Sequence, residues 1–325
     1  MHMHMHTPFL ALSLSLSLYI YIYIYICVCV AAPVLTLTNS LHPNRTSPPL
    51  VYSGLRSSHC LDIYDFYKPH HSEYASVDGK LSQWAYLNSV DMCYQRYKAR
   101  WAGKHGGEAK DVTLDHFDLF AFHSPYNKLV QKGFGRMVFM DARAAGEDCP
   151  ETLREYAAQE LDSTYESRDL EVAVRAVGAP TFKAGVMPCC EINQNIGNCY
   201  TGSVYSSLLS GICEGEVLAG KRMLMFSYGS GSIASMWSFA LRAESGDPRF
   251  SLAAIKEKVN MRARLENRTQ CDVPTFSAAL DLRAAAYGQA PMAPAGDHAH
   301  VAPGTFFLTG INEKHHRSYE RKPTE

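Results

Sequence analysis

His123 is the residue of this sequence best placed to do chemistry. It follows the apolar run Leu119–Phe122, which predicts a short buried strand, and a helical pattern begins just after it. α/β proteins present reactive side chains where a strand ends and a helix begins. An imidazole at such a junction can hydrogen-bond a substrate or move a proton near neutral pH. The alternative is a histidine that only belongs to a capped helix start.

Three basic residues follow His123 at helical spacing. Lys128 and Lys132 lie four residues apart, and Arg136 continues the same face. Like charges at this spacing repel slightly in an isolated helix, so binding of a phosphate-bearing ligand would explain them. A solvated basic face is the alternative explanation.

Two other polar segments are candidates for ligand contact. The segment SYGSGS at residues 227–232 can bring backbone amides close to a phosphate, because glycines allow a close approach. It lacks the lysine and the length of a P-loop, so a hairpin turn is the alternative. Asn195, Asn198 and Tyr200 precede a helical pattern. Asn198 is a candidate helix cap first and a ligand contact second.

Motifs and cysteine spacing exclude several catalytic classes. The sequence has no GxSxG, HExxH, GxxxxGK[ST] or CxxC motif. Two of its ten cysteines lie in an N-terminal repeat, and the others are scattered without zinc-ligand spacing. We therefore expect reduced thiols and no metal site. The net charge of −1 gives no indication of nucleic-acid binding.

Helices alternating with short strands must position these residues. The stripe from Tyr86 to Tyr97 predicts a helix over Leu81–Trp101. The helix after His123 is predicted to start with Ser124 as N-cap and Pro125 as its first residue. This alternation predicts an α/β layered domain that is finished by an antiparallel pair of strands. The other expected elements are a helix with the stripe Tyr200, Val204, Leu208 and Ile212, strands at Arg222–Phe226 and Ile233–Leu241, a helix at Ser251–Asn267 and a strand at Thr305–Thr309.

The first thirty residues differ from the rest of the chain. They consist of Met-His, Ser-Leu, Tyr-Ile and Cys-Val dipeptide repeats, which resemble translated simple-sequence DNA. A metal site at alternate histidines, a membrane anchor over the uncharged stretch Phe9–Leu35 and an aggregation-prone strand are the alternatives. Ala31–Val51 is predicted to be linker. We therefore divide the chain into a disordered or artefactual segment, 1–53, and a folded domain, 54–325.

Six motifs in this order strongly resemble hydroxymethylglutaryl-CoA synthase, a family of the thiolase-like superfamily. They are YDFYKP (64–69), DGKLS (78–82), FHSPYNKLVQK (122–132), GNCYTGSVYSSL (197–208), LAGKRMLMFSYGSGSIAS (218–235) and EKHHRSYERKP (313–323). The resemblance runs from about Gly54 to Pro323. It implies an α/β thiolase-like fold of which this chain supplies essentially the second half, with layered helices on a mixed sheet. It also implies that a large apolar sheet face is left exposed.

The resemblance assigns roles to seven residues. The family condenses acetyl-CoA with acetoacetyl-CoA and water, and it needs no cofactor. His123 corresponds to the histidine that hydrogen-bonds the acetoacetyl group, and Asp65 to an acidic residue that shapes the site. Contacts with CoA or the acyl thioester are implied for Lys128, Lys132, Ser82, Asn198 and Ser230.

The chain also departs from the family pattern. The nucleophilic cysteine and the general-base glutamate of the family precede YDFYKP, and no cysteine here lies in the nucleophile motif. We therefore expect a truncated, inactive synthase, with a non-catalytic protein that binds CoA thioesters or dimerises with a synthase as the alternative. Gly133 and Gly135 replace less flexible residues and should each weaken their helix by about 0.5–1 kcal/mol. The family further implies a homodimer. The scattered cysteines, read as reduced thiols, favour a cytoplasmic protein, and we expect no membrane attachment.

Overall fold

The computed structural model describes residues 49–69, 74–215, 218–242, 248–268 and 270–324. These residues form two compact units, and the division between them falls in helix α10 (Met261–Glu266). The larger unit runs up to Met261, apart from Tyr74, and contains every predicted site residue. The smaller unit begins at Arg262. Residues 1–48 of the predicted N-terminal segment lie outside the described residues.

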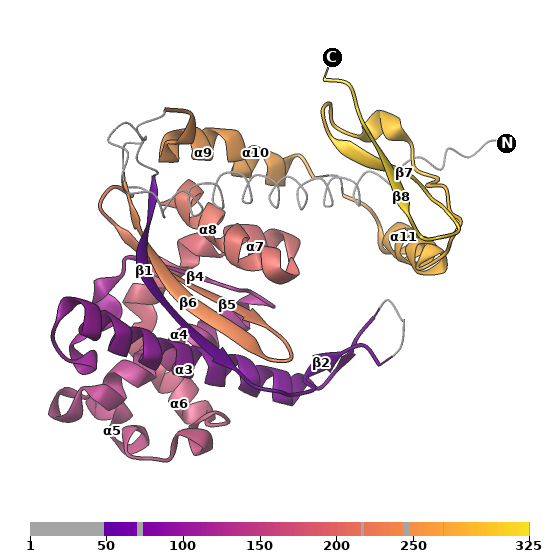
Figure 1. The fold of residues 1–325 in the computed structure, drawn as a ribbon. Helices are drawn as coiled ribbons and strands as arrows, with labels where there is room; N and C mark the ends of the chain where they lie inside the picture. The colour runs from indigo at the N-terminus through magenta and orange to yellow at the C-terminus, as the bar shows by residue number, and fades with distance from the viewer. Residues whose placement is uncertain (1–48, 70–73, 216–217, 243–247, 269, 325) are drawn as a thin grey trace. The chain divides into compact units, whose positions relative to one another are not determined.

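A four-stranded mixed sheet forms the centre of the larger unit (Figure 1). The strand order is β1-β6-β5-β4, with β4 parallel to β5 and the other neighbours antiparallel. The predicted strands are confirmed, and β5 continues three residues beyond the expected end. The four strands are β1 (Leu50–Cys60), β4 (Leu119–Phe122), β5 (Arg222–Gly229) and β6 (Ile233–Leu241).

Strand β1 is an element that the sequence pattern did not predict. It begins at Leu50, which is buried and pairs with Leu241, so the sheet starts inside the stretch predicted to be linker. From Leu55 onward, buried and exposed residues alternate, as expected of a strand with one covered face. The buried side chains include Ser57 and His59, and polar residues in these positions hide the strand pattern.

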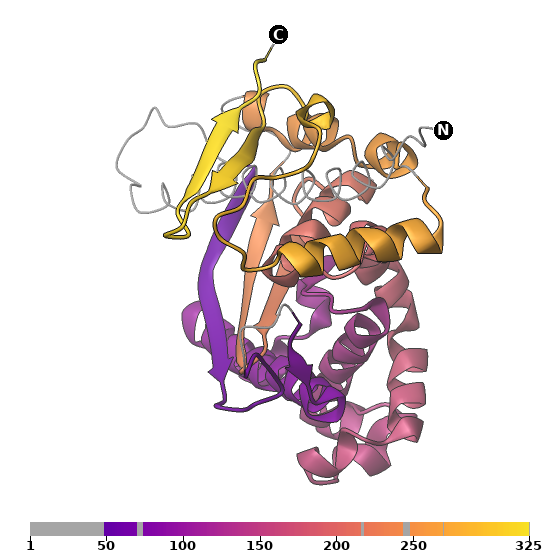
Figure 2. The same ribbon diagram turned by 90° about the vertical axis from the view of Figure 1, so that its right-hand side faces the viewer.

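Helices cover both faces of the sheet (Figures 1 and 2). Helix α3 packs against β1 and β6, and α8 packs on the opposite face against β4 and β5. Every residue of β4 is buried. Among the described strands of this sheet, Ile233 is the large apolar residue left exposed. The expected large exposed apolar face is therefore wrong for these strands: α3 and α8 cover their large apolar side chains, and the exposed positions of β1 include Arg56 and Ser58. The helices are α3 (Gly79–His105), α4 (Asn127–Ala144), α5 (Glu151–Ala157), α6 (Arg168–Thr181), α7 (Glu191–Ile196) and α8 (Ser203–Glu214).

The positions at which α3 and α4 begin are set by local hydrogen bonds. The predicted helix over Leu81–Trp101 is confirmed as part of α3, whose N-cap is Asp78. The start predicted for α4 is wrong: its N-cap is Tyr126, and Ser124 and Pro125 precede the helix. The chain stays extended there because the His123 N–H still donates to Phe226 O across the sheet. A proline also disfavours helical geometry in the residue before it.

The C-terminal elements are only partly as predicted. The expected helix at 251–267 is two helices, α9 (Leu252–Val259) and α10, separated at Asn260, whose φ of 42° is left-handed. The smaller unit contains α11 (Val273–Ala286) and the hairpin of β7 (Phe306–Ile311) with β8 (Arg317–Arg321). The predicted strand at Thr305–Thr309 is thus confirmed as β7. Two short strands of the larger unit, β2 (Phe66–Tyr67) and β3 (Ser76–Val77), also pair. None of the described helices is long and apolar enough to span a membrane.

Glycines allow close contacts around α4. The helix continues through Gly133 and Gly135. A Cβ atom at Gly133 would lie 3.0 Å from the Tyr86 ring, and one at Gly135 would lie 2.9 Å from Val174 Cγ2. These glycines therefore let α3 and α6 approach α4, a packing role that accompanies any loss of helix propensity.

Substituting Gly185 by alanine is expected to lower the free energy of unfolding by about 1–3 kcal/mol. Gly185 lies in a π-helical turn, and a Cβ atom there would come within 2.7 Å of Asp118 O and 3.0 Å of the Phe120 ring. The obstructing oxygen belongs to the backbone at the start of β4, so relief of the clash requires movement of the sheet. Urea denaturation followed by circular dichroism measures the change.

Gly103→Ala is the matched control. Gly103 lies in α3, and no atom of a neighbouring element lies within 4 Å of the position that a methyl group there would take. Because alanine favours helix over glycine by about 1 kcal/mol, this variant should be more stable than the parent. Equal stabilisation by both alanines would contradict the packing constraint at Gly185.

Candidate functional site

His123 stands at the end of β4 in a buried environment. Its side chain is only 6% exposed, and Nδ1 has no hydrogen-bond partner among the described residues. The Tyr86 hydroxyl donates to the carbonyl oxygen of His123 at 2.8 Å. The Tyr228 ring lies beside the imidazole, with 6.4 Å between ring centroids and 30° between planes. Strand, helix and aromatic neighbours therefore fix the position of this histidine.

Burial lowers the pKa of His123 to about 4, although the nearby backbone of Tyr200 acts in the opposite direction. The imidazole is therefore neutral at pH 7, with one N–H donor and one acceptor nitrogen. Tyr200 itself has a φ of 49°, which is uncommon for a residue other than glycine. Such backbone geometry is frequent where a segment is held against a functional side chain.

The shifted pKa of His123 predicts a pH dependence of stability. The unfolded chain titrates near 6.5 at this residue, so it binds more protons than the folded chain between pH 6.5 and about 4. The contribution of a neutral His123 is fully present above pH 6.5 and is lost as the pH falls through this window. Urea denaturation at several pH values should therefore show a steeper decline for the parent than for His123→Gln. Parallel curves would assign the pH dependence to other groups.

Asp65 links the loop after β1 to the turn between β5 and β6. Its side chain is fully buried, and its two carboxylate oxygens accept from the Tyr228 hydroxyl at 3.0 Å and the Gly231 N–H at 2.8 Å. The turn contains Ser230, which is exposed. The segment SYGSGS is thus the end of a hairpin, as the alternative interpretation predicted. Asp65 holds both this turn and the tyrosine beside His123.

Asn198 and Ser82 are connected to His123 indirectly, through Tyr200 and Tyr86 respectively. The Asn198 carboxamide oxygen accepts from the Tyr200 N–H at 2.8 Å and from the Ser203 hydroxyl at 3.0 Å. It orders the segment before α8, but Gly202 occupies the N-cap position, so the predicted cap of that helix is wrong. Ser82 lies in the first turn of α3, one turn before Tyr86. Their predicted contacts with substrate remain predictions.

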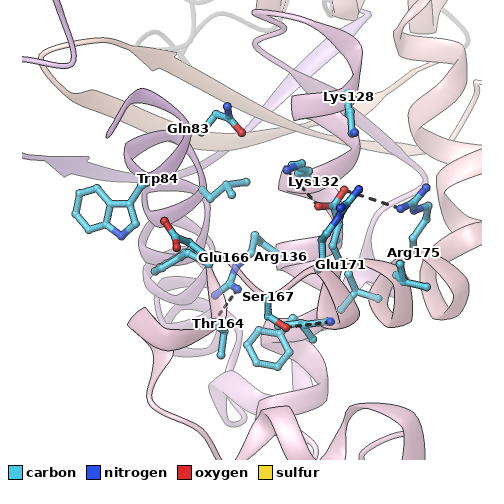
Figure 3. A pocket seen from close by; sticks show the side chains of 18 of the residues that line it. Gln83, Trp84, Lys128, Lys132, Arg136, Thr164, Glu166, Ser167, Glu171 and Arg175 are labelled. Carbon is cyan, nitrogen blue, oxygen red and sulfur yellow. Dashed lines mark hydrogen bonds and ion pairs between the residues drawn. The ribbon is translucent and has the colours of Figure 1, made fainter. Parts of the chain in front are cut away.

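A pocket of about 770 Å³ lies between α3, α4 and α6 (Figure 3). Lys128 and Lys132 both line it, Lys128 being exposed and Lys132 half-buried. The first turns of all three helices contribute to the wall, and helix N-termini attract anions. Leaving Arg136 aside, the charged lining residues are Lys80, Lys128, Lys132, Arg168, Arg175, Asp78, Glu166 and Glu171. Cations therefore outnumber carboxylates, which suits a ligand with phosphate groups.

Arg136 differs from the two lysines. It is 6% exposed and makes a bidentate ion pair with the fully buried Asp91, whose oxygens lie 3.1 and 3.0 Å from Arg136 Nε. It also donates to Thr164 Oγ1 at 2.9 Å, and its guanidinium lies 4.3 Å from the Tyr165 ring centroid. A solvated basic face is thus wrong for Arg136, which instead joins α3, α4 and the turn before α6.

Several residues that form the site were not predicted from sequence. They are Tyr86 and Tyr228, which contact His123, and Glu171, which pairs with Lys132. Tyr86 was assigned only to the buried stripe of its helix. Tyr228 could have been found from its place near the carboxyl end of β5. Because β4 and β5 are adjacent and parallel, they end at the same edge of the sheet, where His123 lies.

Four of the buried thiols are poorly suited to act as nucleophiles. Burial raises the pKa of Cys93 and Cys190 to about 12 and that of Cys213 to about 11, and it also raises the pKa of Cys189. At neutral pH these side chains are thiols, and the thiolate is the reactive form. No disulfide joins any of the eight cysteines in the described part of the chain. The described part of the chain also contains no cluster of His, Cys, Asp or Glu side chains that could hold a metal ion.

The fold places the chain in the thiolase-like class. The solved structure of MvaS in complex with 3-hydroxy-3-methylglutaryl coenzyme A superposes with a TM-score of 0.62 at 27% identity, covering 85% of this chain and 59% of that one. Sheet, covering helices and strand–helix junction are therefore parts of a thiolase-like architecture.

Sequence comparison identifies the family. The family model for the C-terminal part of hydroxymethylglutaryl-coenzyme A synthase matches residues 50–322. Hydroxymethylglutaryl-CoA synthase A of Dictyostelium discoideum is 38% identical over 272 residues, 83% of this chain and 54% of the relative. The human cytoplasmic synthase is 36% identical over 289 residues, 85% of this chain and 55% of the relative. The chain belongs to the hydroxymethylglutaryl-CoA synthase family and corresponds to its C-terminal half. It thus spans little more than half the length of these relatives.

Proposed function

We propose that this chain binds a CoA thioester, with the acyl group at His123 and the CoA phosphates in the basic pocket. One observation carries the proposal: a neutral, buried His123 and the pocket lysines Lys128 and Lys132 all belong to a single strand–helix junction. An acyl group near the imidazole and phosphates near α4 would suit the two ends of one ligand. The CoA bound to related synthases supports the same ligand class.

The reaction to which we propose that this half of the enzyme contributes is that of the family, in which acetyl-CoA, acetoacetyl-CoA and water give hydroxymethylglutaryl-CoA and CoA. When a carbon–carbon bond forms at the acetoacetyl carbonyl carbon, the π electron pair of the C=O bond moves onto the oxygen. The N–H of a neutral His123 can donate to that oxyanion in surroundings largely shielded from water. Asp65 and Tyr228 hold the nearby turn, and Ser82, Asn198 and Ser230 are proposed to contact the acyl thioester.

Isothermal titration of the full chain with acetoacetyl-CoA tests the proposal. We expect binding that weakens about tenfold in Lys128→Gln, because each lysine supplies one charge-assisted contact with a phosphate. The control Lys110→Gln removes an exposed lysine that pairs with Glu108 outside the pocket. Absence of heat with the parent, or equal binding by both variants, would contradict this assignment of the pocket.

Catalysis by this polypeptide alone is a separate question. We propose that it shows no turnover, because the thiols of Cys93, Cys189, Cys190 and Cys213 are protonated at neutral pH and no cysteine lies in the family's nucleophile motif. These thiols favour the second candidate function, a non-catalytic protein that binds CoA thioesters or dimerises with a synthase. Release of CoA from acetyl-CoA plus acetoacetyl-CoA by the purified chain would exclude the second candidate.

Pathway and location are also proposals. We place the activity in the mevalonate route to isoprenoids, in the cytoplasm, with a homodimer as the functional assembly. The human cytoplasmic relative supports this location, although a human mitochondrial synthase is also 33% identical to this chain. Fractionation of cells with an antibody to residues 270–324 would distinguish the two compartments.

A further inference from the structure

Glu171 pairs with two of the cations that line the pocket, Lys132 and Arg175. Its Oε2 lies 3.1 Å from Lys132 Nζ, and its Oε1 lies 3.9 Å from a guanidinium nitrogen of Arg175 (Figure 3). All three side chains line the pocket, and those of Lys132 and Glu171 are 24% and 23% exposed. The pocket therefore already contains an anion at one of its two predicted phosphate-binding lysines.

A phosphate that takes Lys132 must compete with this carboxylate. If Lys132 turns to the ligand, the cation that remains beside Glu171 is Arg175. Its guanidinium lies farther from the Glu171 carboxylate than Lys132 does, and the Arg175 side chain is exposed. A carboxylate that is three-quarters buried is destabilised when its closest cation moves away. The phosphate group and Glu171 also repel each other across a few ångströms. Both effects weaken ligand binding without removing any contact that the ligand makes.

We propose that Glu171 is an internal competitor of the ligand phosphate at Lys132 and that it sets the affinity of the pocket and speeds ligand release. The inference rests on the proposed function, because it takes Lys132 as a ligand contact. It adds a residue whose carboxylate acts against binding. The ligand class is a thioester carrier with phosphate groups, because an uncharged ligand would not compete with Glu171 for Lys132.

The test is isothermal titration of full-length Glu171→Gln with CoA and with pantetheine, which lacks the phosphates. We expect CoA to bind about threefold to tenfold more tightly than to the parent, because one competing ion pair is removed. Stopped-flow measurement should show most of the gain as slower dissociation. Pantetheine affinity should not change. Unchanged or weaker CoA binding by this variant would overturn the proposal, weaker binding meaning that Glu171 positions Lys132 for the ligand.

Two controls separate this competition from general electrostatics and from the proposed function. Glu166→Gln removes the same charge from the pocket wall without touching Lys132, so its gain should be smaller. In a Lys132→Gln background, Glu171→Gln should give no gain, which a double-mutant cycle measures directly. If CoA binds the parent and Lys128→Gln weakens it, but Glu171→Gln gives no gain, the competition alone is wrong. If CoA binds neither parent nor variants, both proposals are overturned.

Discussion

Arg136→Met is expected to lower the free energy of unfolding by about 3–5 kcal/mol. The substitution leaves the carboxylate of Asp91 fully buried without its cation. Among the described residues, the Tyr165 hydroxyl, at 2.9 Å, is the donor that remains. It also removes the donor to Thr164 and the guanidinium that lies over the Tyr165 ring. Breaking one partner of a buried pair is more harmful than removing both, because the uncompensated charge stays in a medium of low polarity.

Two variants sharpen this experiment, which is measured by urea denaturation. Arg143→Met is the matched control on the same helix: Arg143 donates to Gln159 O near the surface, and its loss should cost less than about 1 kcal/mol. The double variant Asp91→Leu with Arg136→Met should recover part of the loss, since neither charge then remains buried. A loss below about 1 kcal/mol in Arg136→Met, or a double variant as unstable as the sum of the singles, would contradict the explanation.

Asp65→Ala is expected to cost about 2–4 kcal/mol in unfolding free energy. It deprives the Gly231 N–H and the Tyr228 hydroxyl of their acceptor in a buried position. Because Tyr228 lies beside His123, the variant should also weaken acetoacetyl-CoA binding more than CoA binding. Urea denaturation and isothermal titration with both ligands measure the two effects.

Asp65→Asn and Tyr228→Phe are the informative companions to Asp65→Ala. Asparagine retains an oxygen for the Gly231 N–H and an amide that can donate to the Tyr228 hydroxyl, so its loss of stability should be the smaller. Phenylalanine keeps the ring beside His123 but removes one donor to Asp65. If Asp65→Ala affects both ligands equally, then Asp65 supports the fold without positioning the acyl site.

Sequence patterns predicted those elements in which apolar spacing alone decides the structure. The helix containing Tyr86 and Tyr97 and strands β4 and β6 have continuous or periodic apolar positions, and these were found where expected. Strand β1 was missed because its buried positions include Ser57 and His59, whose hydroxyl and ring are satisfied by partners on α3. Long-range partners of this kind leave no local signal.

The candidate site shows the same division. The motifs around His123 and Lys132 indicated a histidine and a basic pocket, and the structure contains both. The direction in which Arg136 points was not predictable, because the helical spacing that places it with the lysines cannot show that Asp91 lies opposite. Glu171 was hidden for a similar reason: it reaches Lys132 from another helix.

The pairing of β1 with β6 has a consequence for synthesis of the chain. As a strand, Leu50 to Cys60 pair with Ile233 to Leu241, which follow nearly the whole larger unit in the sequence. At ribosomal elongation rates, roughly 10–35 s separate the appearance of the two segments. During that time the apolar residues of β1 and the face of α3 that it covers have no sheet to join. The apolar side chains of β1 therefore lack their sheet partner for many seconds in the nascent chain, and pairing across so long a sequence separation is expected to be slow.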